Sequence, residues 1–396
     1  MTATTAPAPT SHGTVYTVLF AAALCHGIND TMQAVLLSVY PMLRDNYALT
    51  FAQIGMITLV FQVTASILQP FVGTFTDKYP LPYALPVAPL CTLTGLLLLA
   101  TAHSYHAILI AAAMIGIGSS IFHPDASRVT RLSSGGRFGF AQSTFQVGGN
   151  VGTAIGPLLA AAIVLPRGQG AIAWFALFAV AAFVLLSFVG RWYARYLSEK
   201  RAGKAGKVAT HGLSSQQIVW ALVVLMVLMF SKFVYTSSLH SFYSFYLIDH
   251  FGVTPQDAQI YLFVLFGAIA IGTFAGGPIG DRIGTKAVIW MSIIGTLPFS
   301  LALPYANLLW TVILTVPIGL VLSSAFSAMI VYAQELVPGR VGMISGMFFG
   351  LAFGLAGLGA AALGLVADKT SIDFVFKLCS FLPALGVLAF LLPRTR

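Results

Sequence analysis

The 396-residue chain has very little charge. Asp, Glu, Lys and Arg together make up 8% of its residues, whereas hydrophobic residues make up 58%. A soluble domain carries about 25% charged residues, because its surface must be hydrated. The composition therefore excludes an ordinary soluble domain and predicts a protein whose surroundings are largely lipid.

Several chemical signatures are also missing. The three cysteines, Cys25, Cys91 and Cys379, lie inside apolar stretches without C-x-x-C spacing, so we expect them to pack in the interior and to form neither disulfides nor a metal site. No glycine cluster ends in the Gly-Lys-Ser/Thr of a nucleotide-binding loop, and there is no dinucleotide fingerprint or nucleophile elbow. We therefore expect no cofactor, no ATP drive by this chain and no enzymatic activity.

Twelve segments are long and apolar enough to be read as transmembrane helices, each of which needs about 20 mainly apolar residues. All of them together predict an all-α membrane protein. In the first half the predicted spans are 14–42, 51–75, 83–103, 106–130, 139–164 and 171–192. In the second half they are 216–248, 257–279, 285–304, 307–334, 341–366 and 373–392.

The basic residues indicate how the chain is oriented. The net charge of +9 comes from Lys and Arg in short breaks between apolar runs, so no continuous basic face for nucleic acid is present. Cytoplasmic loops of membrane proteins are enriched in Lys and Arg. If both termini are cytoplasmic, only Arg44, Arg167, Lys369 and Lys377 of the 20 basic residues lie outside, and Lys232 lies within a span. The sequence therefore predicts cytoplasmic termini.

The chain also repeats itself. Gly73 to Lys78 matches Gly277 to Arg282 at an offset of 204, and shorter matches recur at nearly the same offset. Duplicated halves with a substrate site at their interface are common in secondary transporters. We predict a disordered tail over residues 1–13, which lacks the basic start of a secretory signal. Two six-helix bundles follow, over 14–192 and 216–396, joined by a flexible basic linker over 193–215.

The repeated loops at Gly73 and Gly277 resemble the loop signature of the major facilitator superfamily, although Tyr79-Pro80 stands where the usual pattern has Gly-Arg. In addition, Gly152-x-x-x-Gly156-Pro157 is similar to the antiporter motif of drug exporters in that superfamily. Small residues at this spacing also serve general helix packing in lipid, so both interpretations stay open.

Longer strings resemble the fosmidomycin resistance proteins, a family of bacterial exporters. They include LTFAQIGMITLVFQ (49–62), GSSIFHPDASRV (118–129), SGGRFGFAQSTFQVGGN (134–150) and VYAQELVPGRVGMISG (331–346). This resemblance implies a monomer in the bacterial inner membrane that exports an anionic phosphonate antibiotic by proton antiport.

The first predicted span carries the residues that we expect to move protons. His26, Asn29, Asp30 and Gln33 share one helix face at spacings i, i+3, i+4 and i+7. Polar groups facing lipid are costly, so a cavity is favoured, with a buried hydrogen-bond cluster as the alternative. Asp30, near mid-membrane, is the predicted proton carrier, and His26 one turn away is a predicted relay.

Lys232 lies near the middle of the seventh span, with Thr236, His240 and Tyr243 on the same face. An ammonium at mid-membrane needs a partner. We hypothesise that Asp30 faces Lys232, directly or through water, and that an anionic substrate displaces it. A permanent structural ion pair is the alternative.

Other polar residues complete the predicted site. Its substrate-binding residues are Asn29, Gln33, His123, Gln146, Asn150, Lys232, His240 and Tyr243. The predicted gate, at the cytoplasmic helix ends, comprises Asp77, Lys78, Asp125, Arg128, Asp281, Arg282, Glu335 and Arg340, because ion pairs there can form in one state and break in the other.

The sequence thus predicts a proton-coupled exporter of small anionic or polar compounds. A proton-symport importer of a sugar phosphate or organic acid on the same fold is the main alternative. A receptor is disfavoured by the lack of a large soluble domain, and a channel is disfavoured by the two repeated halves, which imply a closed central site.

Overall fold

The structure is a computed structural model that describes residues 13–49, 51–202 and 212–393. The described residues form helices joined by short turns and contain no strand. The N-terminal half consists of α1 (Tyr16–Ser38), α2 (Tyr40–Tyr47), α3 (Phe51–Gln62), η1 (Val63–Ile67), α4 (Leu68–Lys78), α5 (Ala84–Ala100), α6 (Tyr105–Ser133), α7 (Phe138–Leu159), η2 (Ala160–Val164), α8 (Leu165–Arg167), η3 (Gln169–Phe175) and α9 (Ala176–Ala202).

The C-terminal half begins after the residues 203–211 that the structure does not describe. It consists of α10 (Ser215–Phe251), α11 (Pro255–Ile283), α12 (Thr285–Ala302), η4 (Leu303–Tyr305), α13 (Leu308–Ser323), α14 (Ala325–Leu336), α15 (Val341–Lys369), α16 (Ile372–Cys379) and η5 (Leu382–Leu391).

Ten helical segments in the described part of the chain are long and apolar enough to cross a membrane. The apolar helix α5 is shorter, at 17 residues. Helix α1 has 23 residues but is not among the ten, and it is the helix that carries the polar residues His26, Asn29, Asp30 and Gln33. With α1 and α5, the helices account for the twelve predicted spans, and the all-α membrane fold is confirmed.

Three features of the helices were not predicted from the sequence. The second and fifth spans each contain a π-helical stretch, η1 and η2, and π-helices are common at functional sites. Helix α9 continues to Ala202, so the prediction of a linker beginning at residue 193 was wrong. Residues 193–202 include Leu, Glu, Lys, Arg and Ala, which favour helix, so the α9 helix extends beyond its apolar part. The rest of the linker and residues 1–12 of the predicted tail lie outside the described residues.

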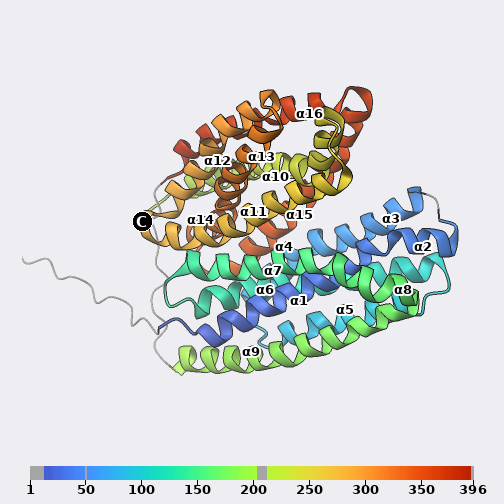
Figure 1. Cartoon of the computed structure of the whole chain (residues 1–396). Helices are drawn as coiled ribbons and strands as arrows, with labels where there is room; N and C mark the ends of the chain where they lie inside the picture. Colours follow the sequence, from blue (N-terminus) through green and yellow to red (C-terminus); the bar gives the residue numbers. More distant parts are fainter. Residues whose placement is uncertain (1–12, 50, 203–211, 394–396) are drawn as a thin grey trace, which may run out of the picture.

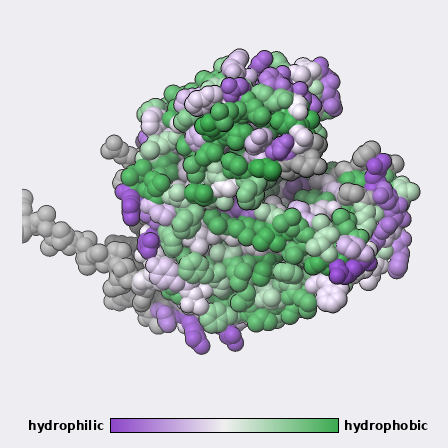
Figure 2. Space-filling model, viewed as in Figure 1, coloured by the Kyte–Doolittle hydropathy of each residue, from purple (hydrophilic) through white to green (hydrophobic). Residues whose placement is uncertain are grey.

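The two halves meet at one end of the molecule and separate toward the other (Figure 1). We call the end where α1 begins the closed end; helices α4 and α15, and α7 and α11, contact each other across the halves. Toward the opposite end, where α2 and α16 lie, Figure 2 shows a hollow between the halves.

The outer surface is apolar over a broad band that covers both halves (Figure 2). Exposed large side chains include Phe71, Leu158 and Phe263, which are 68%, 69% and 76% exposed. A soluble monomer rarely exposes so much apolar surface. This band therefore fits contact with lipid.

Candidate transport site

Helix α1 is held tightly against α7 by small residues. A Cβ atom on Gly152 would lie 2.0 Å from the Gly27 carbonyl oxygen, and one on Gly148 would lie 2.0 Å from the Ala23 carbonyl oxygen. Thr31 adds a hydrogen bond of 3.2 Å to the Gly152 carbonyl across the same contact. The glycines that resemble the antiporter motif therefore lie against the helix that carries Asp30, where only a glycine allows this approach.

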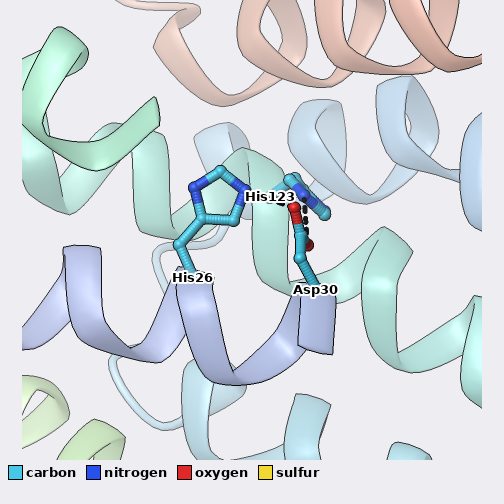
Figure 3. Close-up of side chains that lie close together, drawn as sticks. All are labelled: His26, Asp30 and His123. Atoms are coloured by element: carbon cyan, nitrogen blue, oxygen red, sulfur yellow. Dashed lines mark ion pairs between the residues drawn. The ribbon is translucent and has the colours of Figure 1, made fainter. Parts of the chain in front are cut away.

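His26, Asp30 and His123 form one cluster, although His123 comes from α6 (Figure 3). The Asp30 carboxylate lies 3.3 Å from Nε2 of His26 and 3.7 Å from Nε2 of His123. Both histidine side chains are fully buried, and that of Asp30 is 12% exposed. The structure thus places His123, which the sequence analysis assigned to substrate binding, beside the predicted proton carrier.

Backbone carbonyls orient both imidazole rings. Nδ1 of His26 lies 2.7 Å from the Phe145 carbonyl oxygen, and Nδ1 of His123 lies 2.9 Å from the Ser119 carbonyl oxygen. A carbonyl oxygen only accepts, so each Nδ1 carries hydrogen and donates it. In the neutral rings this leaves the lone pair on Nε2, and both Nε2 atoms face Asp30.

Asn29 and Gln33 complete the surroundings of the carboxylate. Their side-chain amides donate hydrogen bonds of 3.0 and 3.2 Å to Oδ1 of Asp30. The four polar residues of α1 are therefore brought together as one unit. Asn29 and Gln33 contact Asp30 here and do not line the pocket at Lys232.

Apart from the Asp30 cluster, a polar pocket of about 170 Å³ lies between the halves, at Lys232. Its polar lining residues are Gln146, Asn150, Lys232, Thr236, His240, Thr273 and Ser323, and its apolar lining includes Phe233, Phe326, Phe349 and Phe353. The N-terminal half contributes Gln146 and Asn150 from α7, and Asn150 donates to Thr273 of α11 at 3.4 Å.

Lys232 is 5% exposed and has no carboxylate within ion-pair distance among the described residues. Its ammonium instead lies 4.7 Å from the ring centre of Phe233 and 6.0 Å from that of Phe326. The direct Asp30–Lys232 pair that the sequence suggested is therefore not formed in this state. The reason is that two histidines of the N-terminal half already surround Asp30.

The other two predicted substrate-binding residues of α10, His240 and Tyr243, lie in different surroundings. His240 lines the Lys232 pocket, with its ring in edge contact with Phe266 at 4.9 Å. Tyr243 is fully buried in the apolar cluster of the C-terminal half and does not line this pocket, so its role in substrate binding stays a prediction. Helices α13 and α16 pack against α10 and cover that part of its face.

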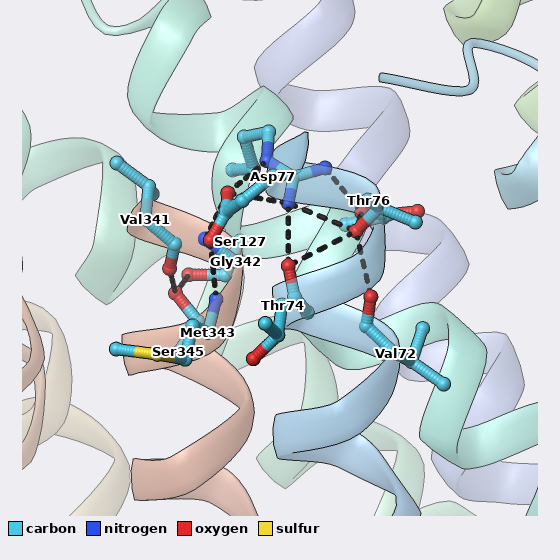
Figure 4. Close-up of polar contacts among 12 residues, drawn as sticks. Val72, Thr74, Thr76, Asp77, Ser127, Val341, Gly342, Met343 and Ser345 are labelled. Atoms are coloured by element: carbon cyan, nitrogen blue, oxygen red, sulfur yellow. Dashed lines mark hydrogen bonds and ion pairs between the residues drawn. The ribbon is translucent and has the colours of Figure 1, made fainter. Parts of the chain in front are cut away.

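At the closed end, Asp77 links the halves (Figure 4). Its carboxylate accepts hydrogen bonds of 2.9 and 2.8 Å from the backbone N–H groups of Gly342 and Met343, in the first turn of α15. The N-terminus of a helix has free N–H donors and a partial positive charge, both of which favour a carboxylate. A Cβ on Gly73 would lie 2.1 Å from the Gly342 carbonyl oxygen, so the two helices pack closely here.

The repeat places Asp281 in the same role for the other half. Its carboxylate accepts two hydrogen bonds of 2.8 Å from the backbone N–H groups of Gly139 and Phe140, in the first turn of α7. Gly277 approaches Gly139 as Gly73 approaches Gly342. The duplication seen in the sequence thus becomes a pair of reciprocal helix caps.

Beneath the Asp77 cap lies a buried charge network. Arg128 lies 2.7 Å from Asp77 and 2.5 Å from Asp125, and Thr76 donates to Asp125 at 2.7 Å. Asp125 and Arg128 therefore form a buried ion pair, in accordance with their predicted place at the gate and away from the pocket.

The other predicted gate residues lie at the same end with other contacts. The Lys78 ammonium lies 5.1 Å from the ring centre of Tyr79, and Arg340 contacts the Met343 sulfur at 3.9 Å. Arg282 and Glu335 line a surface groove of about 720 Å³ beside Asp281.

A third cross-half contact was missed by the sequence analysis. Gln334 of α14 donates to Ser345 at 2.8 Å and to Ser127 of α6 at 3.4 Å, and it accepts from Arg131 at 3.0 Å. Ser127 also donates to Gln142 at 3.0 Å. The available signal was a Gln and two Ser residues inside otherwise apolar helices, where polar groups need partners.

Known proteins agree with this architecture. The family model of the Major Facilitator Superfamily matches residues 19–348 and 225–396. This chain belongs to the major facilitator superfamily. It is a multi-pass membrane transporter of small molecules.

Two relatives match nearly the whole chain. The "Fosmidomycin resistance protein" of Escherichia coli (strain K12) is 54% identical over 396 residues, which cover 100% of this chain and 96% of that protein. The "Uncharacterized MFS-type transporter YfnC" of Bacillus subtilis (strain 168) is 44% identical, covering 96% of this chain and 93% of its own length. The resemblance to the fosmidomycin resistance proteins is therefore confirmed.

Among solved structures, the superfamily transporter FucP in the outward conformation is similar in fold. The two chains align with a TM-score of 0.72 at 15% identity, covering 95% of this chain and 98% of FucP.

Proposed function

We propose that this transporter exports small anionic compounds, fosmidomycin among them, in exchange for protons. The observation that carries the proposal is the pairing of two buried sites in one molecule that is closed at one end. One site has a carboxylate between two histidines, and the other has an ammonium with no carboxylate partner among the described residues. The 54% identity with a fosmidomycin resistance protein over its length supports the choice of substrate.

The proton belongs to the His26–Asp30–His123 cluster. With both Nδ1 atoms donating to carbonyls, two Nε2 lone pairs face an ionised carboxylate if no further proton is present. Acceptors facing one another repel, so a proton between Asp30 and an imidazole stabilises the cluster. Histidine is the side chain whose ordinary change of charge falls in the physiological range of pH, so an imidazole is a suitable partner for sharing this proton.

The anion belongs to the Lys232 pocket. An ammonium buried without a counterion is unfavourable, and a bound anion supplies the missing charge. Gln146, Asn150, Thr236 and His240 offer additional hydrogen-bonding groups in the lining of the same pocket. A pocket of about 170 Å³ suits a small compound.

Alternating access then follows from the closed end, which we place at the cytoplasmic face with both termini. Opening this end breaks the caps at Asp77 and Asp281 and the bonds of Gln334 to the N-terminal half, and lets the anion enter from the cytoplasm. In this proposal the two bundles move as units within the bacterial inner membrane, and a monomer suffices because both sites lie within one chain.

The test is growth of an efflux-deficient bacterium on fosmidomycin. We expect protection by the wild type, no protection by Asp30→Asn or Lys232→Met, and partial protection by Lys232→Arg, which keeps the charge. Asp45→Asn and Lys377→Met change exposed residues of the same types and should protect as the wild type does. Membrane levels of all variants must be matched by immunoblot.

Two outcomes would overturn parts of the proposal. If the well-expressed wild type gives no protection, fosmidomycin is not a substrate. If Lys232→Met protects fully, the anion does not depend on this ammonium. Reconstituted protein with a pH-sensitive dye tests the proton directly: adding fosmidomycin should move protons in the wild type and not in Asp30→Asn.

A further inference from the structure

Two phenylalanines of α15 lie against the histidine cluster. Phe349 is fully buried, and its ring centre lies 5.1 Å from that of His123 and 6.3 Å from that of His26. Phe353, one turn further along, lies 5.3 Å from His123 in edge contact. Both rings belong to the C-terminal half, whereas the cluster belongs to the N-terminal half.

The same two rings also line the Lys232 pocket. Phe326, another lining residue, contacts Phe349 at 5.5 Å and lies 6.0 Å from the Lys232 ammonium. The rings of Phe349 and Phe353 are therefore shared by the two sites: they cover His123 and line the pocket at Lys232.

An aromatic ring neither donates nor accepts a proton in the way that water or a carboxylate does, and packed rings exclude water. No proton path through these rings joins the cluster to the pocket while they are packed on His123. The two sites must therefore communicate through movement of the rings, which means movement of α15 relative to α6.

Helix α15 also carries the cap of the closed end. Gly342 and Met343, bound by Asp77, and Ser345, which donates to Ser127 of α6 at 3.0 Å, lie on the first turns of the same helix. In the opening proposed above, α15 moves away from the N-terminal half, and Phe349 and Phe353 move with it because they lie on the same helix. One rigid element thus links the gate to the cover of the cluster.

We propose that Phe349 and Phe353 form a lid that the C-terminal half places on the proton-binding cluster of the N-terminal half. While the closed end is shut, the lid separates the cluster from the pocket, so a proton reaches the cluster from the outside only at the exposed edge of Asp30, whose side chain is 12% exposed. When that end opens, the lid leaves the cluster and uncovers it toward the cytoplasm. They are positioning residues, and this role rests on the proposed function for its link to proton exchange. The covering of His123 itself is independent of that function.

The covering is tested first by chemical modification of histidine. Purified full-length protein is treated with diethyl pyrocarbonate, and modification of each histidine is followed by mass spectrometry. His123 should be protected in the wild type and modified faster by about tenfold or more in Phe349→Ala and Phe353→Ala, since each change leaves a cavity over the ring. Exposed His106 is the internal reference.

Phe175→Ala is the matched control, because Phe175 is fully buried in the N-terminal half and has no ring contact with either histidine. It should lower thermal stability without exposing His123. If Phe349→Ala and Phe353→Ala leave His123 as protected as in the wild type, the lid is refuted.

The second measurement is proton movement in proteoliposomes with fosmidomycin as the probe. The wild type should move protons only when fosmidomycin is added, whereas Phe349→Ala should leak protons without it, by about tenfold over the wild type. Phe349→Leu, which keeps an apolar side chain, should leak less.

The outcomes separate the two proposals. If the wild type shows no fosmidomycin-dependent proton movement while Phe349→Ala exposes His123, the proposed exchange fails and the lid stands. If the wild type couples and Phe349→Ala couples equally tightly, the lid does not control the proton, and the inference is overturned.

Discussion

Neutralising Asp77 should open the closed end far more than neutralising Asp281. Both aspartates accept two backbone N–H bonds from the opposite half. Asparagine has one acceptor oxygen in place of two, so in either variant one N–H faces an amide donor. Among the contacts of Asp77, its two cross-half bonds distinguish the closed from the open state, because the Asp77–Arg128 pair lies within one half.

The size of the effect follows from burial. A hydrogen bond to a charged group contributes about 1.5–3 kcal/mol, and a neutral one about 0.5–1.5 kcal/mol. At Asp77, whose side chain is 9% exposed, water replaces the lost bond poorly. Asp77→Asn should therefore destabilise the closed state relative to the open state by about 2–4 kcal/mol. That is about a 30- to 1,000-fold shift toward the open state. Asp281 is exposed, so water replaces the lost bond. We therefore expect Asp281→Asn to destabilise the closed state by about 1 kcal/mol, which shifts the equilibrium toward the open state roughly fivefold.

The shift can be measured as a distance distribution. Spin labels at Tyr83 and Ile283, which are exposed near the closed end on opposite halves, report its opening by double electron–electron resonance. The labelled protein needs its three native cysteines replaced. The long-distance population should rise strongly in Asp77→Asn and weakly in Asp281→Asn. Equal shifts in the two variants, or none in Asp77→Asn, would refute the reasoning from burial.

Three further changes test neighbouring parts of the structure. Gly149→Ala places a Cβ 2.5 Å from Nε2 of His26, so the fold should be destabilised by about 1–3 kcal/mol and the variant should no longer protect cells in the fosmidomycin growth assay. Gly354→Ala is the control: it has open space around the new Cβ and should protect normally. Gly73→Ala places a Cβ 2.1 Å from a backbone oxygen of α15, so the spin-label distance should shift to the open state; an unchanged distribution would contradict the close approach. Gln334→Ala removes the cross-half hydrogen bonds to Arg131 and Ser127, of which the bond to the charged Arg131 contributes about 1.5–3 kcal/mol. The melting temperature should therefore fall and the open population should rise; if neither changes, the Gln334 contacts do not hold the gate.

Much of the architecture was predictable because lipid imposes strict rules. A spanning segment must be helical and about 20 residues long, so composition alone predicted the number and placement of the helices. The boundaries were less certain where helices extend into water. Residues 193–202 are polar and basic, and their hydropathy could not distinguish a helical extension of α9 from a linker.

The site was predictable in part. The face of α1 at Asp30 follows from 3.6-residue periodicity, which places His26 and Gln33 beside the carboxylate. Periodicity says nothing about the partner from another helix. His123 of α6 was assigned to substrate, and Lys232 was proposed as the partner of Asp30, because residues 90 or 200 positions apart carry no spacing signal.

The sequence by itself determined that the chain is a helical membrane transporter with repeated halves, since hydropathy, periodicity and the repeat at Gly73 and Gly277 are local properties. Only the tertiary structure decided which buried charges meet. A carboxylate, two imidazoles and an ammonium each need a polar or charged partner in a low dielectric, and several pairings among them satisfy that need. The sequence does not distinguish between these pairings. The packing of α6 and α7 on α1, through glycines that permit contact at backbone distance, placed the histidines at Asp30 and left Lys232 in a separate pocket.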